Sequence, residues 1–403
     1  MKTCLEDLAV FDGPPLFPEP VAVGRPNLPD DTLLFRRWGG MLRSRWLTND
    51  GPAVHEFEDR VRQYLGVAHA IACSNATTGL QLVARALDLR GEVILPSFTF
   101  IGTAHALEWL GLRPVFCDID PQTHGIDPAR IEALITQQTC AILGVHVWGR
   151  PCAIEELTDI AERHHLMLLF DAAHAFGCSY RMVSLGGFGN AEVFSFHATK
   201  VINACEGGIV ATNDAALADR IRQMRNYGFV DSGAVVCRGT NAKLSEAHAC
   251  MGLASLEILA QVIDRNHANY AAYQSQLRDI PGVRSLPVSP GERYHHHYVV
   301  TEIDEALFGL HRDVLESILT AEGVLARRYF HPGCHRMAPY SNCPKTHASL
   351  QHTEALADRV LCLPTGMQLT PDEAAEIGGL LRFCFDNAAA IRCRLGLRSS
   401  AVG

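Results

Sequence analysis

Two charged side chains lie at, or a few residues after, the ends of apolar runs in the middle of the chain. Asp171 ends the run Leu-Met-Leu-Leu-Phe that starts at Leu166, and Lys200 follows the run Val-Phe-Ser-Phe that starts at Val193. A buried carboxylate is costly unless it is paired. A lysine amine in a partly desolvated pocket has a depressed pKa, and its neutral form makes an imine with a carbonyl. The two positions therefore predict an acid and a nucleophilic amine in one site. A helix-capping aspartate and a solvated loop lysine are the alternatives.

A third segment, Cys73-Ser-Asn-Ala-Thr-Thr-Gly79, joins a strand candidate to a helix candidate. Small hydroxyl residues at a helix N-terminus bring backbone N–H groups and the positive end of the helix dipole to one point, which is a ready phosphate site. Ordinary N-capping produces the same pattern. Together the three segments offer an imine-forming amine, a partner for a ring nitrogen and a phosphate cradle. These are the groups that hold pyridoxal 5'-phosphate (PLP).

Strand and helix candidates alternate from residue 69 onward. Seven short apolar runs predict strands at His69–Cys73, Glu92–Pro96, Arg113–Asp118, Cys140–Val147, Leu166–Asp171, Glu192–Phe196 and Gly208–Thr212. Helical stretches lie between most of them, at Thr78–Leu87, Phe100–Leu110, Ile154–His164 and Asp214–Met224. This alternation predicts an α/β fold whose mostly parallel sheet is covered on both faces, with ligands outside the carboxyl ends of the strands.

Three regions are expected along the chain. The first thirty residues carry six prolines, from Pro14 to Pro29, and predict an extended N-terminal arm over residues 1–30 rather than a packed element. A large cofactor-binding domain would follow over residues 31–264. A smaller, mixed α+β C-terminal domain would cover residues 265–403. One long helix, from Ser245 to about Leu277, is expected to bridge the two domains.

Several motifs resemble those of the DegT/StrS family of sugar aminotransferases. The motifs are Pro96-Ser-Phe-Thr-Phe-Ile-Gly-Thr103, Asp171-Ala-Ala-His174, Ser195-Phe-His-Ala-Thr-Lys200, Glu206-Gly-Gly208 and Gly239-Thr-Asn-Ala-Lys-Leu-Ser-Glu246. The resemblance extends from about residue 21 to residue 385. It implies a PLP-dependent transaminase with the aspartate-aminotransferase (type I PLP) fold.

The resemblance also implies roles for individual residues. Lys200 would be the catalytic lysine that forms the Schiff base with PLP, and Asp171 would pair with the ring nitrogen. The remaining cofactor-binding residues would be Ser195, Ala76 and Thr77 at the phosphate, Phe100 stacked on the ring, His174 near the ring hydroxyl, and Asn241. In the family, the residue matching Asn241 reaches the phosphate across a dimer interface, so the resemblance implies a homodimer with a shared active site.

The substrate expected from the resemblance is a nucleotide-linked 4-keto-6-deoxy sugar, usually dTDP-4-keto-6-deoxyglucose, with glutamate as the amino donor. The product would be a 4-amino-4,6-dideoxy sugar for an antibiotic or a surface glycan. Alternative substrates are a 3-keto sugar, a GDP-linked sugar or a cyclitol. A sugar dehydratase on the same scaffold would have a histidine in place of Lys200. A non-catalytic regulatory protein would not need Asp171, Lys200 and the phosphate turn together.

Composition excludes other classes of protein. The chain has 403 residues, 48% apolar and 20% charged, with a net charge of −9, so it lacks the basic footprint of a nucleic-acid binder. Acidic residues near the N-terminus and the lack of a long apolar run predict a cytoplasmic protein without membrane contact. The histidines of His295–His297 and of His331–His335 lack the accompanying ligand spacing of a metal site, so no metal is expected.

Overall fold

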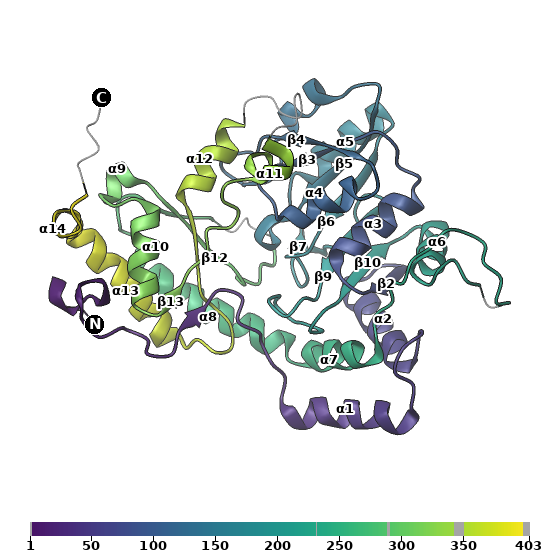
Figure 1. The fold of residues 1–403 in the computed structure, drawn as a ribbon, viewed down its shortest axis with the longest axis horizontal. Coiled ribbons are helices and arrows are strands. Elements are labelled where there is room, and N and C mark those ends of the chain that lie inside the picture. Colours follow the sequence, from purple (N-terminus) through teal and green to yellow (C-terminus); the bar gives the residue numbers. More distant parts are fainter. Residues whose placement is uncertain (1, 231, 288–290, 342–349, 398–403) are drawn as a thin grey trace.

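A seven-stranded sheet forms the centre of the protein in a computed structural model that describes residues 2–230, 232–287, 291–341 and 350–397 (Figure 1). The strands follow the order β2-β10-β9-β6-β5-β3-β4. Their bounds are β2 His69–Cys73, β3 Glu92–Pro96, β4 Arg113–Cys117, β5 Thr139–Val145, β6 Met167–Asp171, β9 Ala191–Ser195 and β10 Gly208–Thr212. Only β10 runs antiparallel to its two neighbours in this sheet. The prediction of a mostly parallel sheet is confirmed.

Alternate strand residues bury themselves in two separate helical layers, as the two-residue period of a strand requires. On one face, Phe170 and Phe194 pack in a cluster with α2 (Pro52–Leu65), α5 (Ile154–His164) and α7 (Glu246–Glu257). On the other face, Leu169 and Val193 pack with α3 (Ala76–Ala86), α4 (Ile101–Glu108) and α6 (Ala215–Arg225). Both faces are therefore covered, which explains why the strands read as continuous apolar runs.

A smaller unit follows in the sequence and contains a three-stranded antiparallel sheet. Its strands are β11 Val283–Ser285, β12 Val299–Ile303 and β14 Val360–Leu363, and its helices include α8 Leu259–Leu277, α9 Glu305–Phe308, α10 Arg312–Ala321, α12 Gln351–Arg359, α13 Pro371–Asp386 and α14 Ala388–Arg394. The short helix α11, Ala338–Ser341, packs instead on the large sheet, where Tyr340 is buried beside Phe116. Helix α8 runs from the large sheet into this unit and packs along α13 (Figure 1). The boundary expected after residue 264 falls inside α8, so the division into domains stays a proposal.

The expected single helix from Ser245 to Leu277 is wrong. The chain forms two helices, α7 and α8, which are separated at Ile258 with φ −101° and ψ 1°. The helices have different partners, because α7 packs on α1 (Asp31–Ser44) and α2 whereas α8 packs on α13. The break lets the chain turn from one layer of the large unit toward the small unit.

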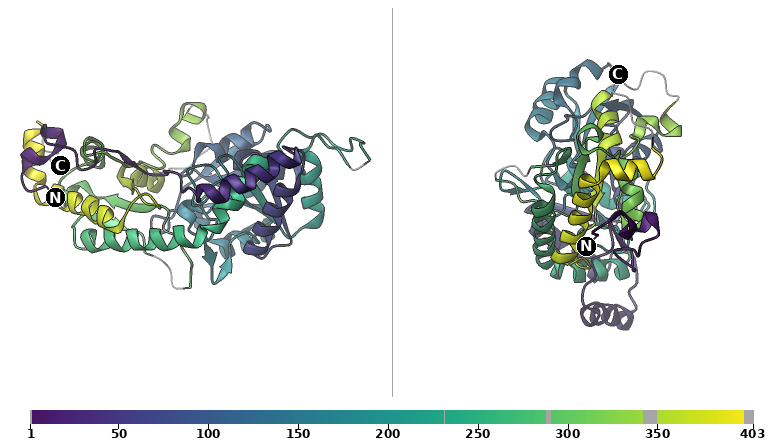
Figure 2. Two further views of the ribbon diagram at one scale, coloured as in Figure 1. Left: turned by 90° about the horizontal axis from the view of Figure 1, so that it is seen from below. Right: turned by 90° about the vertical axis from the view of Figure 1, so that its left-hand side faces the viewer.

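The N-terminal segment is packed, contrary to the expectation of a loose arm. Leu8 is fully buried and Phe17 nearly so, in the same apolar cluster as α10 and α13. Strand β1 (Val21–Ala22) pairs in parallel with β13 (Val324–Leu325). Figure 2 shows the purple N-terminal turns beside the yellow helix α14. Prolines prevent a long helix here, but they leave apolar side chains free to pack.

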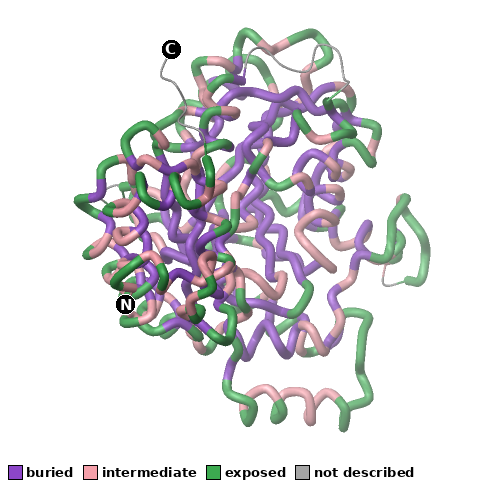
Figure 3. The backbone as a smooth tube through the Cα atoms, turned by 60° about the vertical axis from the view of Figure 1, so that its left-hand side comes forward, coloured by how far each residue is buried: buried purple, intermediate pink, exposed green. Residues whose placement is uncertain are grey.

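Helix α1 packs on α7 and is otherwise largely exposed. It contains no buried residue, and Figure 3 shows it as a strip of intermediate and exposed residues. Phe35 and Leu42 on this helix are 59% and 62% exposed, and large apolar side chains are also exposed at Tyr227 and Val235. None of the helices in the described ranges combines the length and the apolar composition needed to cross a membrane.

Candidate active site

Asp171 and Ser195 occupy the last positions of two neighbouring strands, β6 and β9, and Lys200 follows five residues after Ser195. Because parallel strands end at a common edge of the sheet, this topology brings the three residues together. They line one cavity of about 620 Å³, to which α3, α4 and the segment that ends in Phe330 also contribute. The cavity lies where an open α/β sheet is expected to bind its ligand.

The Asp171 carboxylate is buried and held by two hydrogen bonds. The Thr103 hydroxyl donates to Oδ2 at 2.7 Å, and the Ala173 N–H donates to Oδ1 at 3.0 Å. Burial raises the pKa of Asp171, while these hydrogen bonds and the nearby Lys200 ammonium act in the opposite direction. A carboxylate in this state gains most from a cation placed directly beside it. The protonated nitrogen of an aromatic ring is such a cation.

The Lys200 amine lies at the same cavity and is desolvated. Burial lowers its pKa to about 8, although the Asp171 carboxylate partly opposes the change. At pH 7 roughly a tenth of the amine is therefore neutral, compared with well under a thousandth of an ordinary lysine. This population makes Lys200 a competent nucleophile toward an aldehyde. Within the described cavity wall it is also the only lysine or arginine.

The predicted phosphate turn is present at the start of α3. Asn75 caps the helix because its Oδ1 accepts hydrogen bonds from the Thr78 N–H at 2.8 Å and the Thr78 hydroxyl at 3.0 Å. Ala76 and Thr77 line the cavity beside it. A Cβ at Gly208 would lie 2.7 Å from the Ala76 nitrogen, so only glycine lets β10 pass this close to the turn. The arrangement fits a phosphate group on the helix axis.

Phe100 and His174 line two further parts of the cavity wall. Phe100 is 59% exposed at the N-cap of α4. The Trp148 N–H donates to His174 Nδ1 at 3.2 Å, so the proton of the neutral imidazole is on Nε2. Burial and then the Lys200 charge hold the pKa of His174 well below its usual value. His174 therefore offers a neutral hydrogen-bond donor to an oxygen on a ring in the cavity.

Asn241 is separated from the other predicted residues. It is exposed, does not line the cavity of its own chain, and pairs through an isolated bridge with Asn226. Ala76, Thr77, Phe100, Asp171, His174, Ser195 and Lys200 all line the cavity. The contact of Asn241 with a phosphate across a dimer stays a prediction.

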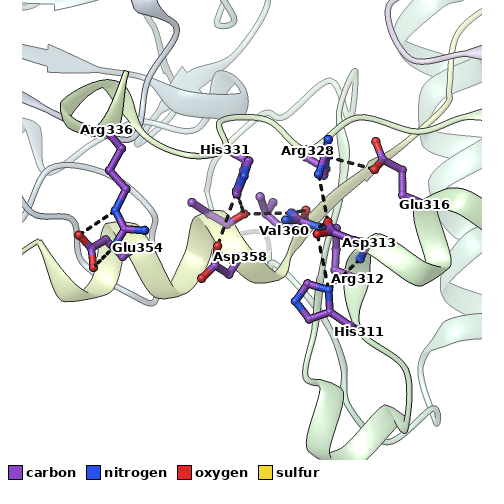
Figure 4. A network of polar contacts seen from close by, with 11 residues as sticks. His311, Arg312, Asp313, Glu316, Arg328, His331, Arg336, Glu354, Asp358 and Val360 are labelled. Carbon is purple, nitrogen blue, oxygen red and sulfur yellow. Dashed lines mark hydrogen bonds and ion pairs between the residues drawn. The ribbon is translucent and has the colours of Figure 1, made fainter. Parts of the chain in front are cut away.

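The two histidine-rich segments contact protein groups, and in the described ranges no cluster of three metal-ligating side chains is found. His295 Nε2 donates to the His174 carbonyl at 2.8 Å, and His297 Nε2 donates to the Thr199 carbonyl at 2.9 Å. In the second segment, His331 lies beside the Asp358 carboxylate. Arg336, which follows this segment, forms an ion pair with Glu354 (Figure 4). The first segment thus supports the backbone on which two site residues stand.

Acid is expected to destabilise the protein through the histidines of the 295–297 segment. Burial lowers the pKa of His295 and His296 to about 3 and of His297 to about 4. Between about pH 6.5 and 4 the unfolded chain binds protons there that the folded chain does not, so the free energy of unfolding falls as the pH falls. Each imidazole contributes up to ~1.4 kcal/mol per pH unit. Urea unfolding of the apoprotein at pH 7, 6 and 5 measures this slope.

The matched variant is His295→Gln/His297→Gln, because glutamine keeps a donor at each position but does not titrate. Its unfolding free energy should depend on pH less steeply than that of the wild type, by about two protons. An identical slope for both proteins would contradict the assignment of neutral, buried imidazoles.

Sequence reasoning missed the residues that support the site. Thr103 is the last residue of the Pro96–Thr103 motif, but its hydrogen bond to Asp171 depends on a contact between α4 and β6. The cavity wall also contains Tyr298, Tyr329 and Phe330 from the small unit. Phe330 and Tyr298 pack against Trp148 in one apolar cluster. Aromatic residues in loops are a weak local signal, so only the fold identifies them.

Comparison with known proteins is consistent with this site. The family model described as "DegT/DnrJ/EryC1/StrS aminotransferase family" matches residues 33–382. The chain is 35% identical to the dTDP-4-amino-4,6-dideoxy-D-glucose transaminase of Shigella dysenteriae, over 90% of this chain and 99% of the relative. It is also 35% identical to the GDP-perosamine synthase of Caulobacter vibrioides, over 82% of this chain and 89% of the relative.

A solved structure extends the likeness to the whole fold. The crystal structure of DesI in the presence of its TDP-sugar product superposes with a TM-score of 0.93 at 52% identity, covering 97% of this chain and 99% of that chain. With the aminotransferase fold and the matching family model, the chain belongs to the DegT/DnrJ/EryC1/StrS family of PLP-dependent aminotransferases.

Proposed function

We propose that this enzyme transfers an amino group from glutamate to C4 of dTDP-4-keto-6-deoxyglucose, which yields a dTDP-linked 4-amino-4,6-dideoxy sugar for an antibiotic or a surface glycan. The observation that carries the proposal is the meeting of the Lys200 amine and the buried Asp171 carboxylate in one cavity that also has a phosphate turn. The sugar and its nucleotide are proposed from the named activity of the Shigella relative and the TDP-sugar product of DesI.

The residues of the cavity fit PLP. Bound PLP supplies an electrophilic aldehyde carbon and a ring that accepts electron density from the substrate. We assign Lys200 to the aldehyde end and Asp171 to the ring nitrogen. Ala76, Thr77 and Ser195 would hold the phosphate, Phe100 would cover a ring face, and His174 would donate to the ring oxygen.

Lys200 has the properties of the acid–base group for the reaction. Once it is released from the cofactor, its amine can take a proton from the substrate carbon and return it elsewhere. Its pKa of about 8 lies near neutral pH, where a group both accepts and donates protons efficiently. Tyr298, Tyr329 and Phe330 give the cavity an apolar wall that limits water around this amine.

A homodimer is part of the proposal. Asn241 is exposed beside a segment with apolar side chains in solvent, including Phe229 and Val235. Helix α1 exposes further apolar side chains. Surfaces of this kind favour burial against a second copy. Because Lys200 is the only lysine or arginine of the described cavity wall, additional positive charge for the substrate diphosphate is expected from such a copy.

A GDP-linked 4-keto sugar is the second candidate substrate, since the Caulobacter GDP-perosamine synthase is as similar in sequence identity as the Shigella enzyme. A 3-keto sugar and a cyclitol are less well supported, because no named relative above acts on them. A purely regulatory role would leave the cavity residues without a purpose.

Incubation of the holoenzyme with glutamate and a panel of ketones tests the proposal. We expect turnover of dTDP-4-keto-6-deoxyglucose, with kcat/KM at least about tenfold above that for the GDP-linked ketone, a difference of about 1.4 kcal/mol in transition-state binding. Mass spectrometry would show the amino sugar, and NMR would place the amine at C4. Turnover of only the GDP-linked ketone, or amination at C3, would overturn the substrate assignment.

A further inference from the structure

The loop that carries Lys200 has no regular secondary structure of its own. It connects β9 to β10 over residues 196–207, and inside it the Lys200 N–H donates only to the nearby His197 carbonyl, at 2.9 Å. A buried irregular segment depends on other parts of the chain to satisfy its backbone groups. The partners of the carbonyls on either side of Lys200 therefore decide where its amine stands.

His297 holds the carbonyl that precedes Lys200. Its Nε2 donates to the Thr199 carbonyl at 2.9 Å, and the side chain is buried, with 4% of the residue exposed. Burial keeps the imidazole neutral because it lowers the pKa to about 4. His297 stands two residues before β12, so this contact ties the loop to the small unit.

Asn27 holds the carbonyl of Val201, the residue that follows Lys200. The Asn27 Nδ2 donates to the Val201 carbonyl at 3.0 Å, and the backbone carbonyl of Asn27 accepts from Asn203 Nδ2 at 2.9 Å. Asn27 Oδ1 accepts from the Met367 N–H at 2.9 Å. Only 1% of the residue is exposed. One amide side chain thus joins the N-terminal segment, the Lys200 loop and the loop after β14.

The residues before Asn27 pack directly on the Lys200 loop. A Cβ on Gly24 would lie 3.0 Å from the Thr199 Cβ, so the Gly24 backbone packs closely on the Thr199 side chain. Val23 is buried in the same apolar cluster as Tyr298 and Phe330, which line the cavity. The N-terminal segment therefore packs on the part of the loop around Thr199, whereas Cys205 and Glu206 at the far end of the loop are exposed.

We propose that Asn27 and His297 are positioning residues that hold the two carbonyls flanking Lys200 and thereby keep its amine in the desolvated cavity. The inference rests on the proposed function only for the reaction that this amine serves. The contacts themselves explain why two distant segments, the N-terminal one and the 295–297 one, converge on a single loop.

The titration of Lys200 in the apoprotein tests the inference without cofactor or sugar. The chain has four lysines, Lys2, Lys200, Lys243 and Lys345, so methylation with ¹³C-formaldehyde gives few NMR signals, and loss of one signal in Lys200→Ala assigns it. We expect Asn27→Leu and His297→Phe to raise the pKa of the Lys200 amine by about one unit, because a displaced loop admits water.

Matched variants separate positioning from general stability. Thr353→Val removes a fully buried hydroxyl that donates to Asp118 Oδ1 at 2.8 Å and is bonded neither to the Lys200 loop nor to the loop after β14. It should lower stability and leave the Lys200 titration unchanged. His297→Gln and Asn27→Ser retain a side-chain donor, should remain folded, and should shift the titration less than the apolar variants. In the holoenzyme forms of Asn27→Leu and His297→Phe, kcat should fall about 10–100-fold with little change in KM.

An unchanged Lys200 titration in folded Asn27→Leu and His297→Phe would overturn the inference, as would an equal shift in Thr353→Val. Should the apolar variants not fold, an unchanged titration in both milder variants would count against it in the same way. Failure of the sugar assay alone would affect the proposed substrate and leave this result standing.

Discussion

Replacement of Lys200 with alanine is expected to lower kcat by roughly 10⁴-fold, at the upper end of what one positioned acid–base group contributes. In the proposed mechanism, the variant loses both the amine that attaches to the cofactor and the group that moves the substrate proton. Among the described residues that line the cavity, no second lysine is present to replace it. The purified variant should also lose the visible absorbance that borohydride bleaches in the wild type.

Lys243→Ala is the matched control for covalent attachment. Lys243 donates to Asn226 Oδ1 at 3.0 Å, and its ammonium lies 4.8 Å from the centroid of Tyr227, outside the cavity. After borohydride reduction, peptide mapping should find the cofactor on Lys200 in wild type and in Lys243→Ala. A reduced adduct that persists in Lys200→Ala would move the attachment to another lysine and contradict the site.

The location of the site was predictable because its signal is local. An apolar run that ends in a charge at Asp171, or in the polar residues that lead to Lys200, marks the carboxyl end of a buried strand. Parallel topology then places neighbouring strand ends at one edge. The bounds of β2, β3 and β10 agree with the predicted runs to the residue. Seven of the eight residues expected from these patterns together with the family resemblance line one cavity.

The support around the site was not predictable, because its contacts join residues that are distant in sequence. Asn27 lies 174 positions from Val201, and His297 lies 98 positions from Thr199. Neither residue stands in a pattern that distinguishes it from other polar residues in loops. In the sequence, the histidine triplet suggested at most a metal ligand. In the structure, His295 and His297 are buried, and each donates one hydrogen bond to a backbone carbonyl near the site.

The predictions of a single helix over residues 245–277 and of an extended N-terminal arm were wrong for a related reason. Composition predicts helix formation across residues 245–277, but the helix is interrupted at Ile258, between α7, which packs on α2, and α8, which packs on α13. The prolines near the N-terminus indicated an extended chain, and they carried no information about the buried Glu322. Its carboxylate accepts the Ala9 and Leu16 N–H groups at 2.8 Å each and so fixes the segment.

Asp171→Asn is expected to lower kcat by on the order of 10²–10³-fold, the usual cost of losing one preorganised electrostatic group. Asparagine cannot balance a positive ring nitrogen, so the bound cofactor becomes a weaker electron acceptor. The local hydrogen bonds survive the change. Asn Oδ1 still accepts from the Ala173 N–H, and Nδ2 can donate to Thr103 Oγ1, which already shares a hydrogen bond with Thr99.

The same substitution should stabilise the apoprotein at pH 7, and the opposite signs of the two effects make the test specific. Burial raises the folded-state pKa of Asp171, so its contribution to stability is present at low pH and is lost as the pH rises through that value. A neutral amide removes this loss. We expect a higher urea midpoint for apo Asp171→Asn than for the wild type at pH 7. The difference should be smaller once both proteins hold cofactor, because the positive ring nitrogen then offsets the charge of the wild-type Asp171 carboxylate. An apo variant that is less stable than the wild type would show that the carboxylate is already compensated by the protein, and it would remove the physical reason for placing a ring nitrogen beside it.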